Sequence, residues 1–237
     1  MFVTIEDMTV RREPASRRER PAKPALTRRG IVDAAVRVMR AEGLEKVTMR
    51  RLAQELDTGP ASLYVYVANT AELHAAVLDA LLGEVDLAVD DAGPAWRDQL
   101  VAVLISYTRL LFAHPQLARS ALVARPSGAH YLDLVERVLG LLSRGGAGRG
   151  QAAWGVDKLL QYATATAAEH GTQAHDPAVA DDWNALAEAV HTVDETSHPM
   201  IRAHLPELLT GPVEDRLSWG FDALINGILG TPLPGAD

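Results

Sequence analysis

Apolar residues recur along this chain at the spacing of helices rather than of strands. The first clear pattern has apolar positions three or four residues apart, which form one helix face: Ile31, Ala34, Ala35, Val38 and Met39. Gly43 predicts the end of this helix. Thr48 can cap a second, shorter helix. The inward face of this second helix consists of Met49, Leu52, Ala53 and Leu56.

The segment from Asp57 to Pro60 predicts a tight turn into a third helix. Asp57 is one of the few non-glycine residues that tolerate left-handed backbone, and Pro60 suits a first helical turn. The third helix therefore begins about three residues after the second ends, which is a helix-turn-helix arrangement. Asn69 and Glu72 have the spacing of a reciprocal N-terminal cap. The fourth helix that they open runs through Leu73, Ala76, Val77, Ala80 and Leu81.

The remainder of the chain is also helical in pattern. Proline residues mark starts at 94, 177 and 212, and breaks fall where 114 and 125 precede proline. These signals predict helices near 94–113, 116–124, 128–143, 151–170, 177–193 and 213–229, with a glycine-rich loop at 143–150 and irregular turns around 197–209. We find no useful alternating pattern and no internal repeat, so we predict an all-α fold.

Composition excludes several classes of protein. The 237 residues include 0 Cys, which removes disulfide scaffolds, zinc–thiolate sites and cysteine nucleophiles. Charge-free runs are shorter than the ~20 apolar residues of a membrane-spanning helix. The N-terminal segment has no apolar stretch suited to export, so we expect a cytoplasmic protein without a membrane partner.

The net charge of −8 hides a strong asymmetry between the two ends. Residues 10–51 carry 13 Lys and Arg against 5 Asp and Glu, whereas residues 76–237 carry 10 against 21. A basic end on an acidic body favours contact with nucleic acid, although a solvated basic tail is the alternative. Residues 1–25, rich in Arg and Pro, are predicted to be a disordered basic arm.

The predicted third helix suits the major groove of DNA, which is about 12 Å wide. Small residues at its start, Pro60, Ala61 and Ser62, allow its N-terminal turn to approach base edges closely. Leu63 and Val67 face the core of the helix-turn-helix. Tyr64 and Tyr66 point elsewhere, either toward DNA or into half-buried packing, and Thr48 and Arg50 are placed to hold a phosphate.

These motifs carry a resemblance to a known family. The segment TRRGIVDAAVRVMRAEGLEKVTMRRLAQELDTGPASLYVYVANTAELHAAVLDALL resembles the DNA-binding head of the TetR family of bacterial transcriptional regulators. The resemblance covers residues 27 to 82 and is most specific from 48 to 73. It implies phosphate contacts and operator contacts made by Thr48, Arg50, Pro60, Ala61, Ser62, Tyr64, Val65 and Tyr66, and Asn69 and Thr70 complete our candidate set.

The sequence departs from the family pattern at several positions. Asp57 stands where a turn glycine is usual, and Ala68 and Thr70 stand where phosphate-binding lysine is frequent. The segment ALVARPSGAHYLDLVERVLGLL is similar to the regulatory core of the tetracycline-repressor branch. Ala121 replaces the magnesium-ligating histidine of that branch, so we carry over neither tetracycline nor its metal.

The sequence gives only weak signals for a metal site or a catalytic site. Glu169 and His170, followed by His175 and Asp176, are the best metal-like cluster, but they lack an HExxH pairing. No GxSxG elbow or ordered Ser-His-Asp set is present. We therefore expect no cofactor, no bound metal and no enzymatic activity.

The C-terminal helices are expected to enclose a ligand and to dimerise. Candidate pocket residues, each also compatible with plain core packing, are Tyr107, Leu111, Phe112, Leu134, Val138, Trp154, Tyr162, Thr166 and Glu169. The family resemblance implies a four-helix dimer interface, with candidates Leu217, Phe221, Leu224 and Ile228 in the last helix.

Together these features predict a ligand-responsive transcriptional regulator in the form of a homodimer. We expect a repressor that a small organic inducer releases from a palindromic double-stranded DNA operator. The predicted domains are the helix-turn-helix at 26–70, a linking helix at 70–89 and a regulatory, dimerising part at 90–237. The alternative is a helical ligand-binding or scaffolding protein without specific DNA recognition.

Overall fold

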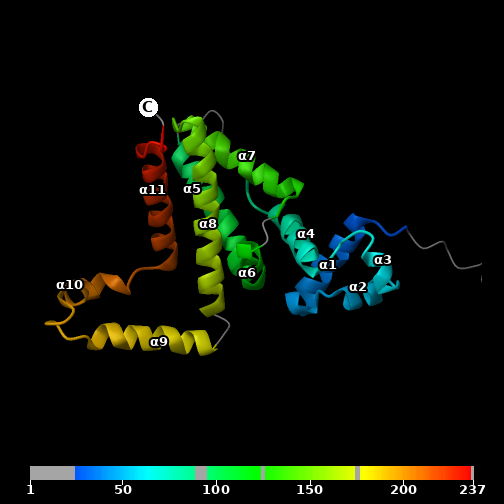
Figure 1. Cartoon of the computed structure of the whole chain (residues 1–237), viewed down its shortest axis with the longest axis horizontal. Helices are drawn as coiled ribbons and strands as arrows, with labels where there is room; N and C mark the ends of the chain where they lie inside the picture. Colours follow the sequence, from blue (N-terminus) through cyan, green and yellow to red (C-terminus); the bar gives the residue numbers. More distant parts are fainter. Residues whose placement is uncertain (1–24, 89–94, 124–125, 174–176, 236–237) are drawn as a thin grey trace, which may run out of the picture.

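A computed structural model of the chain describes residues 25–88, 95–123, 126–173 and 177–235. The described residues form helices and no strands, which confirms the all-α prediction (Figure 1). In chain order the elements are α1 Arg28–Glu42, the 3-10 turn η2 Leu44–Lys46, α2 Met49–Glu55, α3 Pro60–Leu63, α4 Thr70–Leu82, α5 Trp96–Ala113, α6 Pro115–Val123, α7 Ala129–Arg144, α8 Arg149–Gln173, α9 Pro177–Thr192, α10 Pro199–Leu208 and α11 Val213–Gly230. The predicted arm at 1–25 lies outside the described residues except for its last residue.

The first four helices form a small head around their own apolar centre. Ile31 of α1, Leu52 of α2, Leu63 of α3 and Leu73 of α4 are all fully buried. Each of these residues belongs to the inward face that the sequence pattern predicts. The Thr27 side chain caps α1 by accepting from the Gly30 N–H at 3.0 Å.

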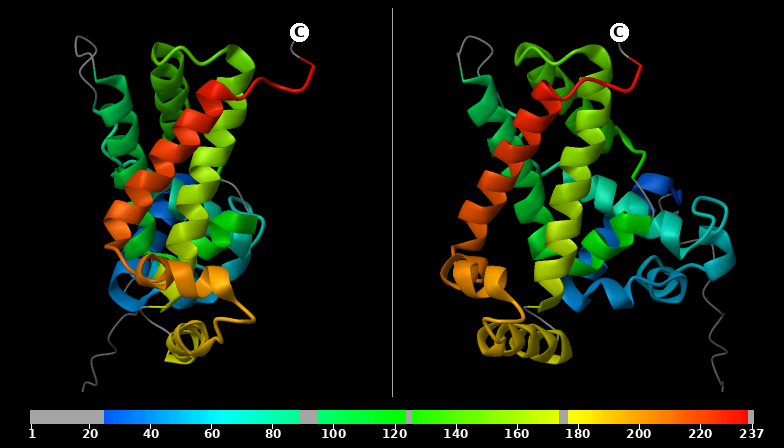
Figure 2. Two further views of the ribbon diagram at one scale, coloured as in Figure 1. Left: turned by 90° about the vertical axis from the view of Figure 1, so that its left-hand side faces the viewer. Right: turned by 60° about the vertical axis from the view of Figure 1, so that its left-hand side comes forward.

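The remaining helices form the body, in which α5 and α8 pack along each other (Figure 2). α7 and α11 pack against the same pair, and α6 closes one side of α8. Side chains from all five helices are buried there: Leu104, Leu111, Leu117, Leu134, Val138, Leu159 and Phe221. Burial of this apolar surface is the main stabilising term of the body.

Helix α4 belongs to both parts. It packs on α1 within the head and on α6 and α7 of the body. The buried apolar side chains form one continuous cluster from α1 to α11, and Leu78 and Leu81 of α4 lie within it. A displacement of α4 would therefore disturb packing in the head and in the body together.

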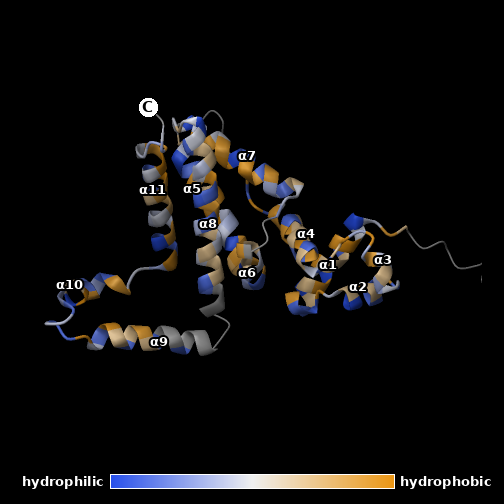
Figure 3. Cartoon of the chain, viewed as in Figure 1, coloured by the Kyte–Doolittle hydropathy of each residue, from blue (hydrophilic) through white to orange (hydrophobic). Residues whose placement is uncertain are grey.

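Helices α9 and α10 project from one end of the body (Figure 1). α10 buries none of its residues, and the coloured parts of both ribbons mix apolar and polar residues (Figure 3). The expectation of irregular turns around 197–209 is wrong, because Pro199–Leu208 is helical. Pro199 occupies the first turn, where proline is favoured, and the helix accommodates Pro206 in its interior.

Within the described residues, no single helix combines the length and apolar composition needed to cross a membrane. Helices α5 and α6 reach that composition only when taken together, and they are bent by 110° relative to each other.

Candidate DNA-binding surface and ligand pocket

A tight turn presents α3 at the surface of the head. Thr48 caps α2 by accepting from the Arg51 N–H at 3.2 Å. Asp57 then adopts left-handed backbone with φ 46°, as its place in the turn predicts. Pro60 occupies the first turn of α3, which ends already at Leu63. The predicted third helix is therefore shorter than its pattern indicates, because residues 64–66 form turns rather than further helix.

Burial divides the residues of this segment into two sets. Leu63 and Val67 are buried in the head, as predicted. On the opposite side Tyr64 is 54% exposed and Val65 is 80% exposed. The remaining candidates Pro60, Ala61 and Ser62 are exposed as well, and Tyr66 is half-buried. Exposed aromatic and branched side chains at one surface are typical of a binding surface.

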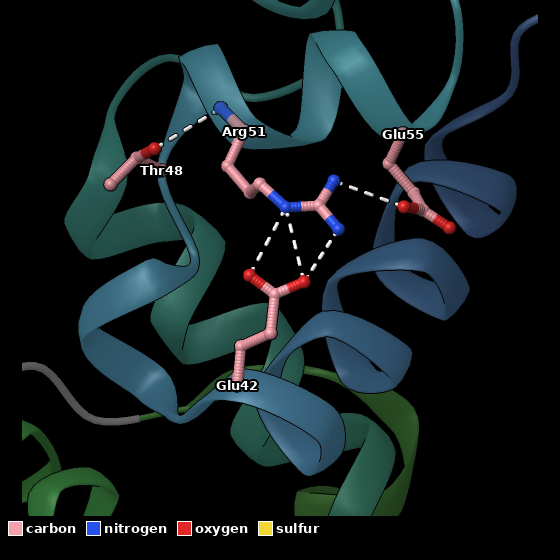
Figure 4. A network of polar contacts seen from close by, with 4 residues as sticks. All are labelled: Glu42, Thr48, Arg51 and Glu55. Atoms are coloured by element: carbon pink, nitrogen blue, oxygen red, sulfur yellow. Dashed lines mark hydrogen bonds and ion pairs between the residues drawn. The ribbon is translucent and has the colours of Figure 1, made fainter.

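An arginine network fixes α2 against the end of α1 (Figure 4). The Arg51 guanidinium donates to both oxygens of Glu42, with a shortest contact of 2.5 Å, and to Glu55 at 3.0 Å. These bonds hold the pKa of Glu42 below its ordinary value and raise that of Arg51. Because Glu42 and Glu55 occupy it, Arg51 has a structural role in the head.

Arg50 contrasts with its neighbour. It is exposed at the start of α2, beside the exposed Thr48. Among the described residues it forms no ion pair, so its charge is available to a phosphate. Sequence reasoning placed Thr48 and Arg50 at the DNA backbone, and in the structure both are exposed at the start of α2.

A second polar cluster fixes the start of α4. Asn69 accepts from the Glu72 N–H at 2.9 Å, and Glu72 accepts from the Ala68 N–H at 2.7 Å. The predicted reciprocal cap thus forms, except that Glu72 accepts from the N–H of Ala68 rather than from that of Asn69. Arg28 of α1 also donates to Glu72 at 3.2 Å. Thr70 is exposed beside this cap.

A small cavity, open to solvent on one side, lies between α5, α6, α7 and α8, with a volume of about 70 Å³. Tyr107 is 2% exposed at its wall, and its hydroxyl shares a 2.8 Å hydrogen bond with Thr164. Burial raises the pKa of Tyr107 to about 12, so this phenol stays neutral near pH 7. The lining residues are Tyr107, Ala121, Leu122, Pro126, Tyr131, Asp157, Leu160, Gln161 and Thr164.

The structure does not bring the nine predicted pocket residues together. Of that set, Tyr107 lines the cavity. Phe112 lines a separate depression between α5 and α11, and Trp154 is 58% exposed on the outer side of α8. Leu111, Leu134 and Val138 are fully buried in the core. Trp154 was expected to line the pocket and instead faces outward.

The error in α8 is one of helical phase. The prediction followed the polar side chains Tyr162, Thr166 and Glu169, but Tyr162 packs edge-on against Phe221 and Glu169 is exposed. Leu160 and Thr164, two residues away, face the cavity instead. Two residues correspond to about 200° around a helix, which moves a side chain to the other side. The run of small residues at Ala163, Thr164 and Ala167 was the available signal for burial.

The candidate dimer residues of α11 fall into two groups. Leu217 and Phe221 are buried in the core of their own chain. Leu224 and Ile228 are half-buried and line an apolar groove between α8 and α11, with a volume of about 450 Å³. Gly220 lies against Tyr162 of the same chain, whose hydroxyl would be 2.1 Å from an added Cβ. The groove is therefore the part of these α11 candidates that stays open, and Trp154 also lines it. Trp219 of α11 is 73% exposed.

The metal-like cluster can be followed only in part. His175 and Asp176 lie outside the described residues. Glu169 is exposed, and the ring of His170 packs edge-on against Phe112 with centroids 6.3 Å apart. Across the described part of the chain, no three His, Asp or Glu side chains gather as metal ligands would.

A helix-turn-helix with an exposed third helix, joined by one helix to a helical body, is an arrangement found in DNA-binding transcriptional regulators. Two family models match this chain. Residues 31–77 match bacterial regulatory proteins of the tetR family, and residues 90–231 match the tetracyclin repressor-like C-terminal domain. The chain belongs to the TetR family of transcriptional regulators.

Relatives and solved structures agree with this assignment. The transcriptional repressor DrrR1 of Streptomyces coeruleorubidus is 30% identical over 90% of this chain and 80% of its own length. The crystal structure of the transcription regulator SCO7704 of Streptomyces coelicolor is 67% identical, covering 91% of this chain and 100% of that one, with a TM-score of 0.77. ActR of Streptomyces coelicolor in complex with actinorhodin is 35% identical, covering 86% and 96%, with a TM-score of 0.74.

Proposed function

We propose that this regulator is a homodimeric repressor, which a small organic ligand releases from a palindromic operator. The observation that carries the proposal is the exposed side of the helix-turn-helix, where Tyr64 and Val65 stand in solvent above a fully buried Leu63. Exposed side chains on a rigid element suit base contacts, and the two-fold symmetry of a dimer implies a palindromic site. Such a protein works on DNA in the cytoplasm.

In this proposal the chain divides as its sequence pattern indicates. Residues 26–70 read DNA, the segment at 70–89 links the two parts, and residues 90–237 bind ligand and dimerise. The helix of the linking segment, α4, ends at Leu82 and is shorter than its sequence pattern predicts. The groove between α8 and α11 supports the last assignment, because a second copy can cover its apolar lining. The relative DrrR1, which is a repressor, supports repression rather than activation.

The ligand site in this proposal is the cavity beside Tyr107 and Thr164. ActR, the 35% identical relative solved with actinorhodin, supports an organic ligand. The cavity of about 70 Å³ is smaller than the ~300 Å³ or more of typical ligand sites. A flat organic molecule must therefore displace lining side chains as it enters, and this displacement is the source of the switch.

The test measures binding of the purified chain to DNA from upstream of its own gene, by fluorescence anisotropy. Actinorhodin and (S)-DNPA, which the solved ActR complexes contain, serve as probes, with and without chelator. We expect a probe that binds to weaken operator affinity by roughly 5–150-fold, whether or not chelator is present. Tight probe binding with unchanged operator affinity would refute ligand-controlled release. Failure to distinguish operator from scrambled DNA would instead support the helical scaffold alternative.

A further inference from the structure

Helix α7 begins without a cap of its own. Its N-cap residue is Gly128, which has no side chain, and its first turn contains no acidic residue. The first N–H groups of a helix need acceptors, and their partial positive charge favours a carboxylate. The sequence around Gly128 does not supply one.

Asp79 of α4 supplies it from the other side of the head–body junction. Its Oδ1 accepts from the Tyr131 backbone N–H at 3.0 Å, and its Oδ2 lies 3.5 Å from Nδ1 of His130. The Asp79 side chain is only 17% exposed. A Cβ at Gly128 would lie 2.0 Å from Oδ2 of Asp79, so glycine is required for this close approach.

The cap lies next to the cavity between α5, α6, α7 and α8. Tyr131 lines that cavity together with Pro126, which precedes Gly128 in the chain. One short segment, residues 126–131, therefore contacts the cavity through its side chains and α4 through its backbone.

We propose that Asp79 is the positioning residue that fixes the DNA-reading head relative to the body, by capping the first turn of α7. The part of this inference that concerns the ligand rests on the proposed function: a molecule entering beside Tyr131 disrupts the cap and releases α4. The positional part does not depend on DNA or ligand, because it concerns the orientation of α4 on α7 alone.

The first test uses pulsed electron paramagnetic resonance. It measures how widely the distance between a spin label on the head and a spin label on the body is distributed. The chain has 0 Cys, so spin labels attach only at introduced cysteines, one at the exposed Ala41 of α1 and one at the exposed Ser143 of α7. An excess of unlabelled chain suppresses distances between protomers. The variants are Asp79→Ala, Asp79→Asn and Gly128→Ala, with the exposed Asp133→Ala of α7 as the matched control.

We expect a broader distribution in Asp79→Ala and in Gly128→Ala, whose added Cβ expels the carboxylate. Asp133→Ala keeps the native distribution, and Asp79→Asn stays close to it because an amide oxygen still accepts from Tyr131. Combining Gly128→Ala with Asp79→Ala adds no further broadening, since no carboxylate remains to be expelled. An unchanged distribution in folded Asp79→Ala or Gly128→Ala overturns the proposal.

The second test compares binding to a full operator and to a single half-site. Loss of positioning should weaken full-operator binding by about tenfold and leave half-site binding unchanged, because only the full site requires two heads at a fixed spacing. An equal loss on both DNAs would place the defect within the head and overturn the proposal. If wild type binds neither DNA specifically, the proposed function fails, and the spin-label measurement still decides the role of Asp79.

Discussion

Single polar side chains determine how the helix-turn-helix is held. Thr48 and Asn69 cap α2 and α4 as their spacing predicts, and Asp57 takes the left-handed conformation that the family pattern assigns to glycine. The ion pair between Arg51 and Glu42 could not be predicted from residue spacing. It joins residues nine apart on two helices, so it follows from the angle between α1 and α2 rather than from helical spacing.

The Glu42 carboxylate makes the stability of the head depend on pH. Its pKa is lowered in the fold, mainly by the hydrogen bonds from Arg51. Its stabilising contribution is therefore complete above its ordinary pKa of 4.5 and is lost as pH falls through the lowered native value. Thermal melting of Glu42→Gln should fall below that of wild type at pH 7, and the difference should shrink as pH drops below 4.5. A constant difference across this range would contradict the role given to the ion pair.

At the scale of elements, local signals predicted where most helices begin and end. Proline and cap residues give the starts of α4, α9 and α11 directly. The prediction chose the wrong side of α8, because the polar residues Tyr162, Thr166 and Glu169 resemble a ligand face whatever packs beside them. The run of small residues on the buried side was a weaker signal. Which side is buried depends on the positions of α5 and α11, and these are set by long-range packing. The cavity lining was missed for the same reason.

The groove between α8 and α11 yields a prediction about assembly. Leu217 is unsuitable as a probe because it lies in its own chain's core, so aspartate there would damage folding. Trp219→Asp combined with Ala223→Asp places two charges on the exposed side of α11 and should yield monomers in sedimentation velocity. Leu132→Asp, at a 59% exposed position of α7, serves as the control and should remain dimeric. A stable dimer of the double variant would place the interface elsewhere.

At the scale of the molecule, a basic N-terminal end is joined to an acidic body. The arm carries six cations, Arg11, Arg12, Arg17, Arg18, Arg20 and Lys23. We expect these cations to replace the phosphate-binding lysines that the family often carries at the positions of Ala68 and Thr70. Deleting residues 1–24 should weaken binding to all DNA sequences alike and flatten the dependence on salt, because fewer counterions are released. An unchanged slope of log affinity against log salt would show that the arm is inert.

The central claim is that the exposed side of α3 and its flanking turn reads a specific operator. The most direct test measures the affinity for upstream DNA relative to scrambled DNA in wild type, Tyr64→Ala and Ser62→Arg. Met200→Ala, which removes a 67% exposed side chain from α10, serves as the control. Wild type and the control should prefer the operator by about 10³-fold or more, and both α3-region variants should lose most of that preference while melting as wild type does. Full preference retained by Tyr64→Ala and Ser62→Arg would contradict the account.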